Sequence, residues 1–420
     1  MISAEARPYI DASVPVLRTH GLAITTAFYA NMFAAHPELT NLFNMGNQAS
    51  GVQQQSLAAA VFAYAANIDN AAALEPVIQR IVHKHVSIGI REEHYPIVGH
   101  FLLGAIEQVL GDAATPALIA AWDEAYSELA GALISVEKAM YQRAGITPGQ
   151  LRSVRIVDIR NESDDVKSFV LEAVDGQPLP SFEPGQYVSV SITFADGSTQ
   201  LRQYSLSDAA EPQHMRISVK REREHSAHPA GRVSNWLHDE VGQGSTLQIT
   251  HPFGDFTPDA TSAAPIVLLS AGIGITPMIS VLNRIAQVHP WREVIFGHAA
   301  RSKGAHSHRT DVATAKASMP NLQVTSFYEE LHEHDADDAS DSAAIGGVKG
   351  AIQCTMPSTI LHGRMDITKL PRWSRVDTDV YLCGPRDFMH DQWRALLEIG
   401  IPVKHLHREV FGPELLDFVS

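Results

Sequence analysis

The stretch Gln200-Leu201-Arg202-Gln203-Tyr204-Ser205-Leu206-Ser207 decides the fold of the middle of this chain. Side chains alternate between the two faces of a β-strand, so Arg202 and Tyr204 are predicted to share one face. Gln203 and Ser205 then point to the other face. A guanidinium can bind a diphosphate through two hydrogen bonds, and the face of a phenol can stack on a planar ring. The stretch therefore indicates a site for a ligand with a diphosphate and a flat ring, although an ordinary exposed Arg and half-buried Tyr would have the same sequence.

Alternating segments on both sides of this stretch predict a small antiparallel Greek-key β-barrel over residues 150–257. Gly and Pro turns separate five such segments: Val154–Ile159, Lys167–Glu172, Tyr187–Phe194, Leu201–Leu206 and Met215–Lys220. One of these turns, at Pro184-Gly185, leads to a second aromatic, Tyr187. Val233 and Ser234 lie where a short helix begins, and the free N–H groups of that helix suit a diphosphate. An ordinary capped helix explains the last segment equally well.

Residues 262–420 have the pattern of an α/β unit with a parallel sheet. Pro265–Ser270 is a continuous apolar run, as expected of a buried parallel strand. A loop follows that can bring backbone amides close to a phosphate: Gly272, Ile273, Gly274, Ile275, Thr276 and Pro277. We expect Thr276 to cap the next helix and Pro277 to lie in its first turn. The Gly-x-Gly-x-x-Gly fingerprint of many dinucleotide-binding proteins is absent.

Two further strands of this unit end in polar loops. Glu293–His298 leads to Arg301, which could meet a phosphate or be a solvated loop charge. Val380–Cys383 is followed by Gly384 and Pro385. Ligands of open α/β sheets bind at the carboxyl ends of the strands, so these junctions suit a nucleotide. Cys383 itself is interpreted as a small spacer and not as a nucleophile.

Residues 1–146 are predicted to be all-helical, with breaks at Pro37, Pro76, Pro96 and Pro116. An apolar stripe from Ile78 to Ile88 places His85 on a buried face. Glu137 interrupts another apolar stripe, and an unpaired buried carboxylate is costly, so Glu137 should have a partner. Considered singly, His85 could be an ordinary core histidine and Glu137 could lie at a half-solvated helix end.

Length and composition limit the classes of function. A chain of 420 residues should divide into about two to four domains. The formal charge is −15 and no basic run is dense enough to follow phosphates, so nucleic acid is not an expected partner. No apolar stretch is long enough to span a bilayer, and the N-terminus lacks the pattern of a signal peptide. The two cysteines cannot support a disulfide framework, and a cytoplasmic location is expected.

Several motifs together resemble known families. The Arg-x-Tyr-Ser strand, the Gly-x-Gly-x-Thr-Pro loop and the Cys-Gly-Pro junction resemble the ferredoxin–NADP reductase superfamily. The helical part resembles the globin domain of bacterial flavohaemoglobins through these stretches: Asn31-Met32-Phe33, Pro37-Glu38-Leu39, Leu42-Phe43-Asn44-Met45, Lys84-His85 and His94-Tyr95-Pro96-Ile97-Val98-Gly99. The tail Arg408–Pro413 resembles the flavohaemoglobin C-terminus, although Arg408 stands where family members carry Tyr. The resemblance covers nearly the whole chain in the same domain order.

The resemblance implies three cofactors and a role for particular residues. It implies that His85 is the proximal ligand of haem b. It also implies that Tyr29, Gln53 and Leu57 line the distal pocket, where oxygen binds. Tyr95 and Glu137 are then expected to form hydrogen bonds around the proximal imidazole. Lys84 and Glu409 join the predicted catalytic residues. The residues expected to bind FAD and NAD(P)H are Tyr187, Arg202, Gln203, Tyr204, Ser205, Val233, Ser234, Gly272, Ile273, Gly274, Ile275, Thr276, Pro277, Cys383, Gly384, Pro385, Val410, Phe411, Gly412 and Pro413.

The activity implied by the resemblance is that of a nitric oxide dioxygenase, which converts NO and O₂ to nitrate with electrons passed from NAD(P)H through FAD to haem. Two alternatives remain: a haem-based carrier or sensor of O₂ or NO with a self-reducing module, and an NAD(P)H-dependent flavin or ferric reductase. A monomer is expected, and the distal pocket could take a lipid or another hydrophobic ligand. Between Glu329 and Ile367, His332, His334 and several Asp residues are expected in a solvated loop, with a metal site as a less favoured alternative.

Overall fold

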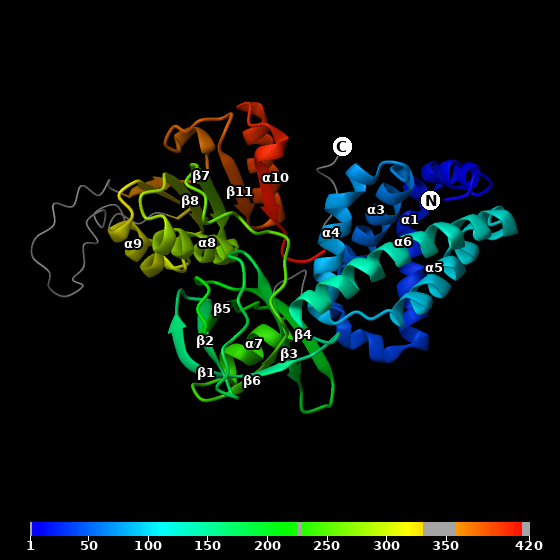
Figure 1. Ribbon diagram of the computed structural model, residues 1–420, viewed down its shortest axis with the longest axis horizontal. Helices are drawn as coiled ribbons and strands as arrows, with labels where there is room; N and C mark the ends of the chain where they lie inside the picture. Colours follow the sequence, from blue (N-terminus) through cyan, green and yellow to red (C-terminus); the bar gives the residue numbers. More distant parts are fainter. Residues whose placement is uncertain (1, 225–228, 331–357, 414–420) are drawn as a thin grey trace, which may run out of the picture.

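The computed structural model describes residues 2–224, 229–330 and 358–413, arranged as three units (Figure 1). A helical unit forms one side of the molecule, and a β-barrel and an α/β unit stack beside each other on the other side. The segment around His332 and His334, which the sequence predicts to be a solvated loop, lies outside the described residues. Within the described ranges, none of the helices combines the length and hydrophobicity that crossing a bilayer requires.

The helical unit confirms the all-helical prediction for the first third of the chain. Its elements are α1 (Arg7–Ala35), η1 (Pro37–Leu42), α2 (Met45–Ala49), α3 (Val52–Ala66), α4 (Ala71–Ile88), α5 (His94–Leu110), η2 (Gly111–Ala113) and α6 (Pro116–Ala144). Helix α6 begins at Pro116 because the Thr115 hydroxyl accepts a hydrogen bond from the Leu118 N–H, and proline suits the first turn. The break predicted at Pro76 is wrong, because this proline lies inside α4, near its start.

The barrel consists of β1 (Arg152–Asn161), β2 (Val166–Ala173), β3 (Tyr187–Thr193), β4 (Thr199–Ser205), β5 (Met215–Lys220), α7 (Arg232–Asp239) and β6 (Thr246–Ile249). The strand order is β4-β3-β6-β1-β2-β5, and every pairing is antiparallel. A bridge between Leu206 and Ile217 links the two edge strands and closes the sheet on itself. Strand β6 was not predicted, because four residues are too few for a periodic signal. The predicted antiparallel barrel is confirmed.

The α/β unit has a parallel sheet in the order β10-β9-β8-β7-β11-β12. Its elements are β7 (Ile266–Ala271), η3 (Gly272–Gly274), α8 (Ile275–Val288), β8 (Val294–Ala300), α9 (Arg309–Ser318), β9 (Leu322–Tyr328), β10 (Thr359–His362), η6 (Ile367–Lys369), β11 (Asp379–Cys383), α10 (Arg386–Glu398), η7 (Val403–His405) and β12 (Leu406–Glu409). Alternate residues of β7 face two separate cores, one formed with α8 and α9 and one with α10. Both faces of the sheet are therefore covered, as the apolar run at 265–270 predicted.

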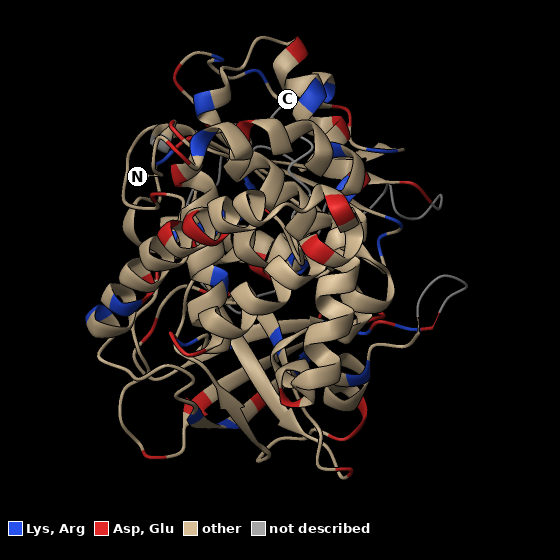
Figure 2. Ribbon diagram, turned by 90° about the vertical axis from the view of Figure 1, so that its right-hand side faces the viewer, with Lys and Arg blue, Asp and Glu red and all other residues tan. Residues whose placement is uncertain are grey.

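Hydrogen bonds join the helical unit to the barrel through α4. The Ser189 hydroxyl of β3 donates to the Ser87 carbonyl at 2.7 Å, and the Gln203 amide of β4 donates to the Ser87 hydroxyl at 2.6 Å. The Gly254 N–H donates to Nδ1 of His83 at 3.0 Å. The described end of the tail, at Gly412, returns to the same helix (Figure 1). Viewed from the helical side, acidic and basic residues are interspersed over the helices (Figure 2).

Candidate functional site

The helical unit holds a hydrogen-bonded triad around the half-buried His85. Helix α4 carries His85, whose Nδ1–H donates to Oε1 of Glu137 at 2.7 Å. The Tyr95 hydroxyl, from α5, donates to the same oxygen at 2.6 Å and lies 3.2 Å from the His85 Nδ1. Glu137, on α6, is only 3% exposed. The prediction that Glu137 has a partner is thus confirmed, and its partners are a histidine and a phenol.

This arrangement determines which nitrogen of His85 remains available. Burial and the neighbouring Glu137 carboxylate raise the pKa of Tyr95 far above its usual range, so the phenol keeps its proton and acts as a donor. Glu137 accepts from both neighbours, so it holds the proton of His85 on Nδ1. Nε2 is then the ring nitrogen with a lone pair for a metal ion. An imidazole with a carboxylate on its far nitrogen is the donor arrangement typical of a haem-iron ligand, so these residues fit haem.

A second polar pair lies on α1 and α3. Nε2 of Gln53 donates to the Tyr29 hydroxyl oxygen at 3.3 Å. Burial raises the pKa of Tyr29 to about 12, so the phenol stays protonated near neutral pH. Because its oxygen accepts from Gln53, the Tyr29 proton can be donated to a further acceptor. Stacking with Phe33 at 5.7 Å between ring centroids and an edge contact with Phe43 at 5.8 Å hold the ring.

Strand β4 presents Arg202 without an acidic partner. Its guanidinium donates to the Leu201 carbonyl at 2.7 Å and to Oε1 of Gln200 at 3.0 Å. In the described part of the chain no carboxylate forms an ion pair with Arg202, and burial lowers its pKa. A partly buried cation bonded only to neutral acceptors suits a diphosphate. Tyr204, two residues after Arg202 on the same strand, packs against the barrel core, and burial raises its pKa above the usual range.

The remaining residues predicted to bind flavin differ in burial and in hydrogen bonding. Tyr187 and Val233 are buried, and Tyr187 pairs with Ser205 across the β3–β4 ladder. The Ser234 hydroxyl donates to the Gly231 carbonyl and accepts from the Glu222 N–H, both at 3.1 Å. Ser234 therefore fixes its own loop, and its contact with a diphosphate stays a prediction.

The glycine-rich loop and the Cys383 junction meet at the carboxyl end of the sheet. A Cβ on Gly274 would lie 2.6 Å from the Gly384 nitrogen, so only glycine allows the two loops to pack. Gly272 has a φ of +53°, in the region that favours glycine. The predicted cap is wrong: α8 begins at Ile275, and the Thr276 hydroxyl donates backward to the Ile273 carbonyl at 3.0 Å. Pro277 does lie in the first turn.

The other predicted residues of these loops differ in their surroundings. Cys383 is fully buried, and burial raises the pKa of its thiol well above the usual value. This agrees with a spacer, because the nucleophilic form of cysteine is the thiolate. Ile273 lies in the loop, and Ile275, the first residue of α8, is buried in the core. Pro385 immediately precedes α10.

The tail brings the α/β unit into contact with the helical unit. Glu409, at the end of β12, is 8% exposed, whereas Phe411 is 45% exposed. The Lys84 ammonium, adjacent to His85, donates to the Gly412 carbonyl. Val410 and Pro413 flank this contact. The predicted residues Lys84 and Gly412 are thus brought together, although they are 328 positions apart in the chain.

Ser87 is a residue that the sequence reasoning missed. It is buried on α4, its hydroxyl donates to the Lys84 carbonyl at 2.7 Å, and it receives hydrogen bonds from two barrel strands. A serine two residues after a histidine carries no signal by itself. Only the packing of the barrel on α4 identifies it.

Comparison with known proteins agrees with this geometry. Residues 26–133 match the Globin family model, residues 153–257 match the Oxidoreductase FAD-binding domain, and residues 268–393 match the Oxidoreductase NAD-binding domain. The flavohemoprotein of Bordetella parapertussis is 44% identical over 98% of this chain and 99% of its own length. The flavohemoprotein of Chromobacterium violaceum is 45% identical over 98% of both chains.

Solved structures extend the comparison to the arrangement of the units. The flavohemoglobin of Malassezia yamatoensis, crystallised with bound FAD and heme, has a TM-score of 0.82 and 27% identity over 98% of this chain and all of its own. The FAD/NAD-binding domain of nitric oxide dioxygenase from Vibrio cholerae has a TM-score of 0.53 and 31% identity over 62% of this chain and 99% of its own. With relatives above 40% identity over nearly its full length, the chain belongs to the flavohaemoprotein family.

Proposed function

We propose that this protein is an NAD(P)H-dependent nitric oxide dioxygenase that uses FAD and haem b to convert NO and O₂ to nitrate. The proposal rests chiefly on one observation, the buried Glu137 carboxylate that accepts from both His85 and Tyr95. A carrier that only binds oxygen has less need of such a carboxylate. Membership of the flavohaemoprotein family supports the same conclusion.

The bound cofactors supply the redox chemistry: hydride acceptance, one-electron transfer and oxygen activation. The protein contributes the ligand for the iron and the polarity around it. His85 would hold the iron through Nε2, and Glu137 makes the imidazole more basic by accepting its Nδ1 proton. A more basic ligand donates more electron density and favours oxygen chemistry over reversible carriage. Tyr95 fixes the Glu137 carboxylate in place.

Tyr29 is the residue that would donate a proton to the reactant bound at the iron. Gln53 orients the phenol by donating to its oxygen, and burial keeps the phenol protonated. The ring contacts with Phe33 and Phe43 restrict its rotation. A fixed donor that needs no reorganisation stabilises developing negative charge better than water does.

The other residues would hold the flavin and the nicotinamide nucleotide. Arg202 is a partly buried cation without an acidic partner in the described chain, which suits the diphosphate of FAD. The close packing of Gly274 on Gly384 places two backbone loops at the carboxyl edge of the sheet, where a nucleotide would bind. Ser87 and Lys84 connect the His85 helix to the barrel and the tail.

The test follows NO consumption and nitrate formation by purified protein loaded with haem and FAD, in the presence of NAD(P)H and air. We expect rapid consumption by the wild type and its loss in His85→Ala. A matched control is Tyr141→Phe, which removes a buried hydroxyl on α6 that donates to the Ile90 carbonyl at 2.9 Å. Unchanged NO consumption in His85→Ala would reject haem chemistry and favour a flavin or ferric reductase. Oxygen binding without nitrate formation would favour a carrier or sensor.

A further inference from the structure

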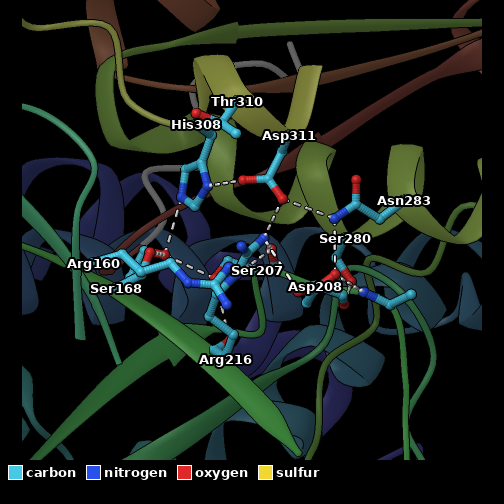
Figure 3. Close-up of polar contacts among 12 residues, drawn as sticks. Arg160, Ser168, Ser207, Asp208, Arg216, Ser280, Asn283, His308, Thr310 and Asp311 are labelled. Carbon is cyan, nitrogen blue, oxygen red and sulfur yellow. Dashed lines mark hydrogen bonds and ion pairs between the residues drawn. The ribbon is translucent and has the colours of Figure 1, made fainter. Parts of the chain in front are cut away.

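A polar cluster with buried residues at its centre joins the barrel to the α/β unit, and we call it the inter-domain joint. It comprises Arg216 and Ser218 of β5, Asp208 beyond β4, Asn283 of α8, and His308 and Asp311 at the start of α9. Figure 3 shows Arg216 extending from the barrel strand toward His308 and Asp311 on the other unit. The mechanism proposed above uses none of these residues.

Arg216 is the barrel's contribution to the charge balance of the joint. It is 3% exposed, and its Nη2 donates to Oδ1 of Asp311 at 2.8 Å. The same nitrogen lies 3.5 Å from Oδ2 of Asp208, and Nε donates to the Ser207 carbonyl at 3.2 Å. One guanidinium thus binds a carboxylate of the α/β unit and the segment that directly follows the predicted flavin strand. An unpaired buried cation would be strongly unfavourable, so moving the two units apart at this contact would be costly.

His308 joins the two units a second time. Its Nδ1–H donates to Oδ2 of Asp311 at 2.9 Å, and its Nε2 accepts from the Ser218 hydroxyl at 3.0 Å. Glu162, in the turn between β1 and β2, lies 3.7 Å from Nδ1. His308 is fully buried and has a φ of +61°, a conformation uncommon for a residue other than glycine. The backbone therefore adopts an energetically costly conformation, and in that conformation the imidazole contacts Ser218 of the barrel.

The joint is directly connected to the helix that follows the glycine-rich loop. The Ser280 hydroxyl of α8 donates to the Asp208 carbonyl at 2.7 Å. Asn283, one turn later, donates to Oδ1 of Asp208 at 2.8 Å and to Oδ1 of Asp311 at 3.1 Å. Asp208 follows Ser205 of the flavin strand by three residues, and Ser280 follows Thr276 of the loop by four. The strand proposed to bind flavin and the loop proposed to bind nucleotide are therefore connected by hydrogen bonds three and four residues beyond Ser205 and Thr276.

The same cluster could be interpreted as a metal site. Glu162, His308 and Asp311 are the one group of three such side chains, in the described part of the chain, whose ligand atoms lie within 4.8 Å of one another. Here both nitrogens of His308 and both oxygens of Asp311 already have hydrogen-bond partners. The Arg216 guanidinium supplies the positive charge that a cation would bring. The chemistry of the cluster is therefore that of a polar joint.

We propose that Arg216, His308 and Asp311 are positioning residues for hydride transfer, which fix the α/β unit against the barrel so that the nicotinamide meets the flavin. This inference rests on the proposed transfer of hydride from NAD(P)H to FAD, and it does not depend on the NO chemistry. Apolar surfaces can slide over each other at little cost, whereas a buried charge pair has a single well-bonded geometry. A displacement of about 1 Å at a reacting centre can slow a reaction by about 100-fold.

The test is single-turnover reduction of the flavin by NAD(P)H, followed in a stopped-flow spectrometer with the full-length, cofactor-loaded protein. In Asp311→Asn, a change of nearly equal shape, we expect the rate constant at saturating nucleotide to fall about 10- to 100-fold. The nucleotide concentration at half-saturation should change far less, because the nucleotide's own loop remains intact. The deuterium isotope effect with 4-deuterated nucleotide should persist, since the affected step is hydride transfer. FAD content should equal that of the wild type.

Two further variants keep the proposal testable if Asp311→Asn folds poorly. Asn283→Ala removes only the neutral bridge between Asp208 and Asp311, so a smaller decrease, of about two- to fivefold, is expected. Asp239→Asn is the matched control, since Asp239 forms an ion pair with Arg221 at 2.5 Å within the barrel itself. It should reduce its flavin at the wild-type rate.

The outcomes separate this inference from the proposed function. Wild-type protein that fails to transfer hydride to its flavin would reject the proposed function. Normal hydride transfer in the wild type, together with normal hydride transfer in Asp311→Asn and Asn283→Ala, would overturn the inference that the joint positions the two units. An equal decrease in Asp239→Asn would also overturn it, because the effect would then be general destabilisation. Treatment with EDTA should not change the rate; a loss that Zn²⁺ restores would assign the cluster to a metal instead.

Discussion

The Gln203 amide of β4 donates a 2.6 Å hydrogen bond to the hydroxyl of Ser87, two residues after His85. The Ser87 carbonyl accepts from the Ser189 hydroxyl of the neighbouring strand at 2.7 Å. The helix that carries the proposed iron ligand is therefore bonded directly to the strand that carries Arg202 and Tyr204. A hydrogen-bonded connection therefore runs from the proposed flavin strand to the helix that carries His85.

Replacing Gln203 with leucine should slow electron passage from flavin to haem. The lost hydrogen bond contributes about 1 kcal/mol, so the closely packed arrangement of helix and barrel should become about fivefold less favoured. Stopped-flow spectra should show haem reduction slowed by a similar factor and flavin reduction affected less. The control is Thr193→Val, which removes an exposed hydroxyl contact to Thr199 within the barrel. Equal haem reduction in Gln203→Leu and wild type would contradict this role.

Glu137→Gln should weaken turnover while haem is retained. The amide keeps the size of the carboxylate but cannot accept two hydrogen bonds as an anion, so the His85 imidazole becomes a weaker donor. Loss of such an outer partner typically costs about 10- to 100-fold in activity. NO-dependent nitrate formation and the iron–histidine stretching frequency are the measurements, and both should decrease. Tyr95→Phe should have a smaller effect in the same direction, because Glu137 keeps its bond to His85. Full activity in Glu137→Gln would disprove the electronic role of the carboxylate.

Tyr29→Phe should accelerate oxygen release. Removal of one neutral hydrogen bond worth about 1 kcal/mol predicts an increase of about fivefold in the dissociation rate constant, measurable by flash photolysis or ligand displacement. Tyr64→Phe is the control, because its hydroxyl is engaged with the Ala125 carbonyl at 3.0 Å. An unchanged rate constant in Tyr29→Phe would exclude the phenol as a donor.

The same phenol predicts a pH dependence. Burial raises the pKa of Tyr29 to about 12, so its proton is present at lower pH and is lost only as the pH rises through that value. Oxygen release by the wild type should therefore be independent of pH from neutrality to about pH 10. A rise in the dissociation rate constant near pH 10, the usual pKa of tyrosine, would show that Tyr29 is not buried as described.

Gly274→Ala should destabilise the α/β unit. The added methyl group would lie 2.6 Å from the Gly384 nitrogen, and the backbone there cannot rotate away as a flexible side chain could. Overpacking of this kind costs about 1–3 kcal/mol. Thermal release of flavin and the half-saturating NAD(P)H concentration should report the change. Gly242→Ala provides the comparison, because a Cβ at that position meets nothing within 4 Å. Equal behaviour of the two variants would reject the close approach of the loops.

The sequence by itself determined the order and type of the three units. Continuous apolar residues at 265–270 are sufficient for a strand buried on both faces, and alternation is sufficient for the barrel strands. A buried carboxylate needs a partner, so Glu137 could be predicted to have one before His85 and Tyr95 were placed beside it. In each case either the pattern lies within one short stretch of the chain, or the cost of burying a charge applies to a single residue. Both can be recognised without knowing which distant residues are in contact.

Tertiary structure alone decided the features that depend on distant contacts. Pro76 lies inside α4 and β6 exists with only four residues, because packing against neighbours outweighs a weak local preference. Ser87 and the inter-domain joint were not predicted. Arg216 and Asp311 are 95 residues apart and look like ordinary surface charges in the sequence. Whether a charge is buried, and which opposite charge meets it, depends on how two folded units fit together, and no local pattern encodes that fit.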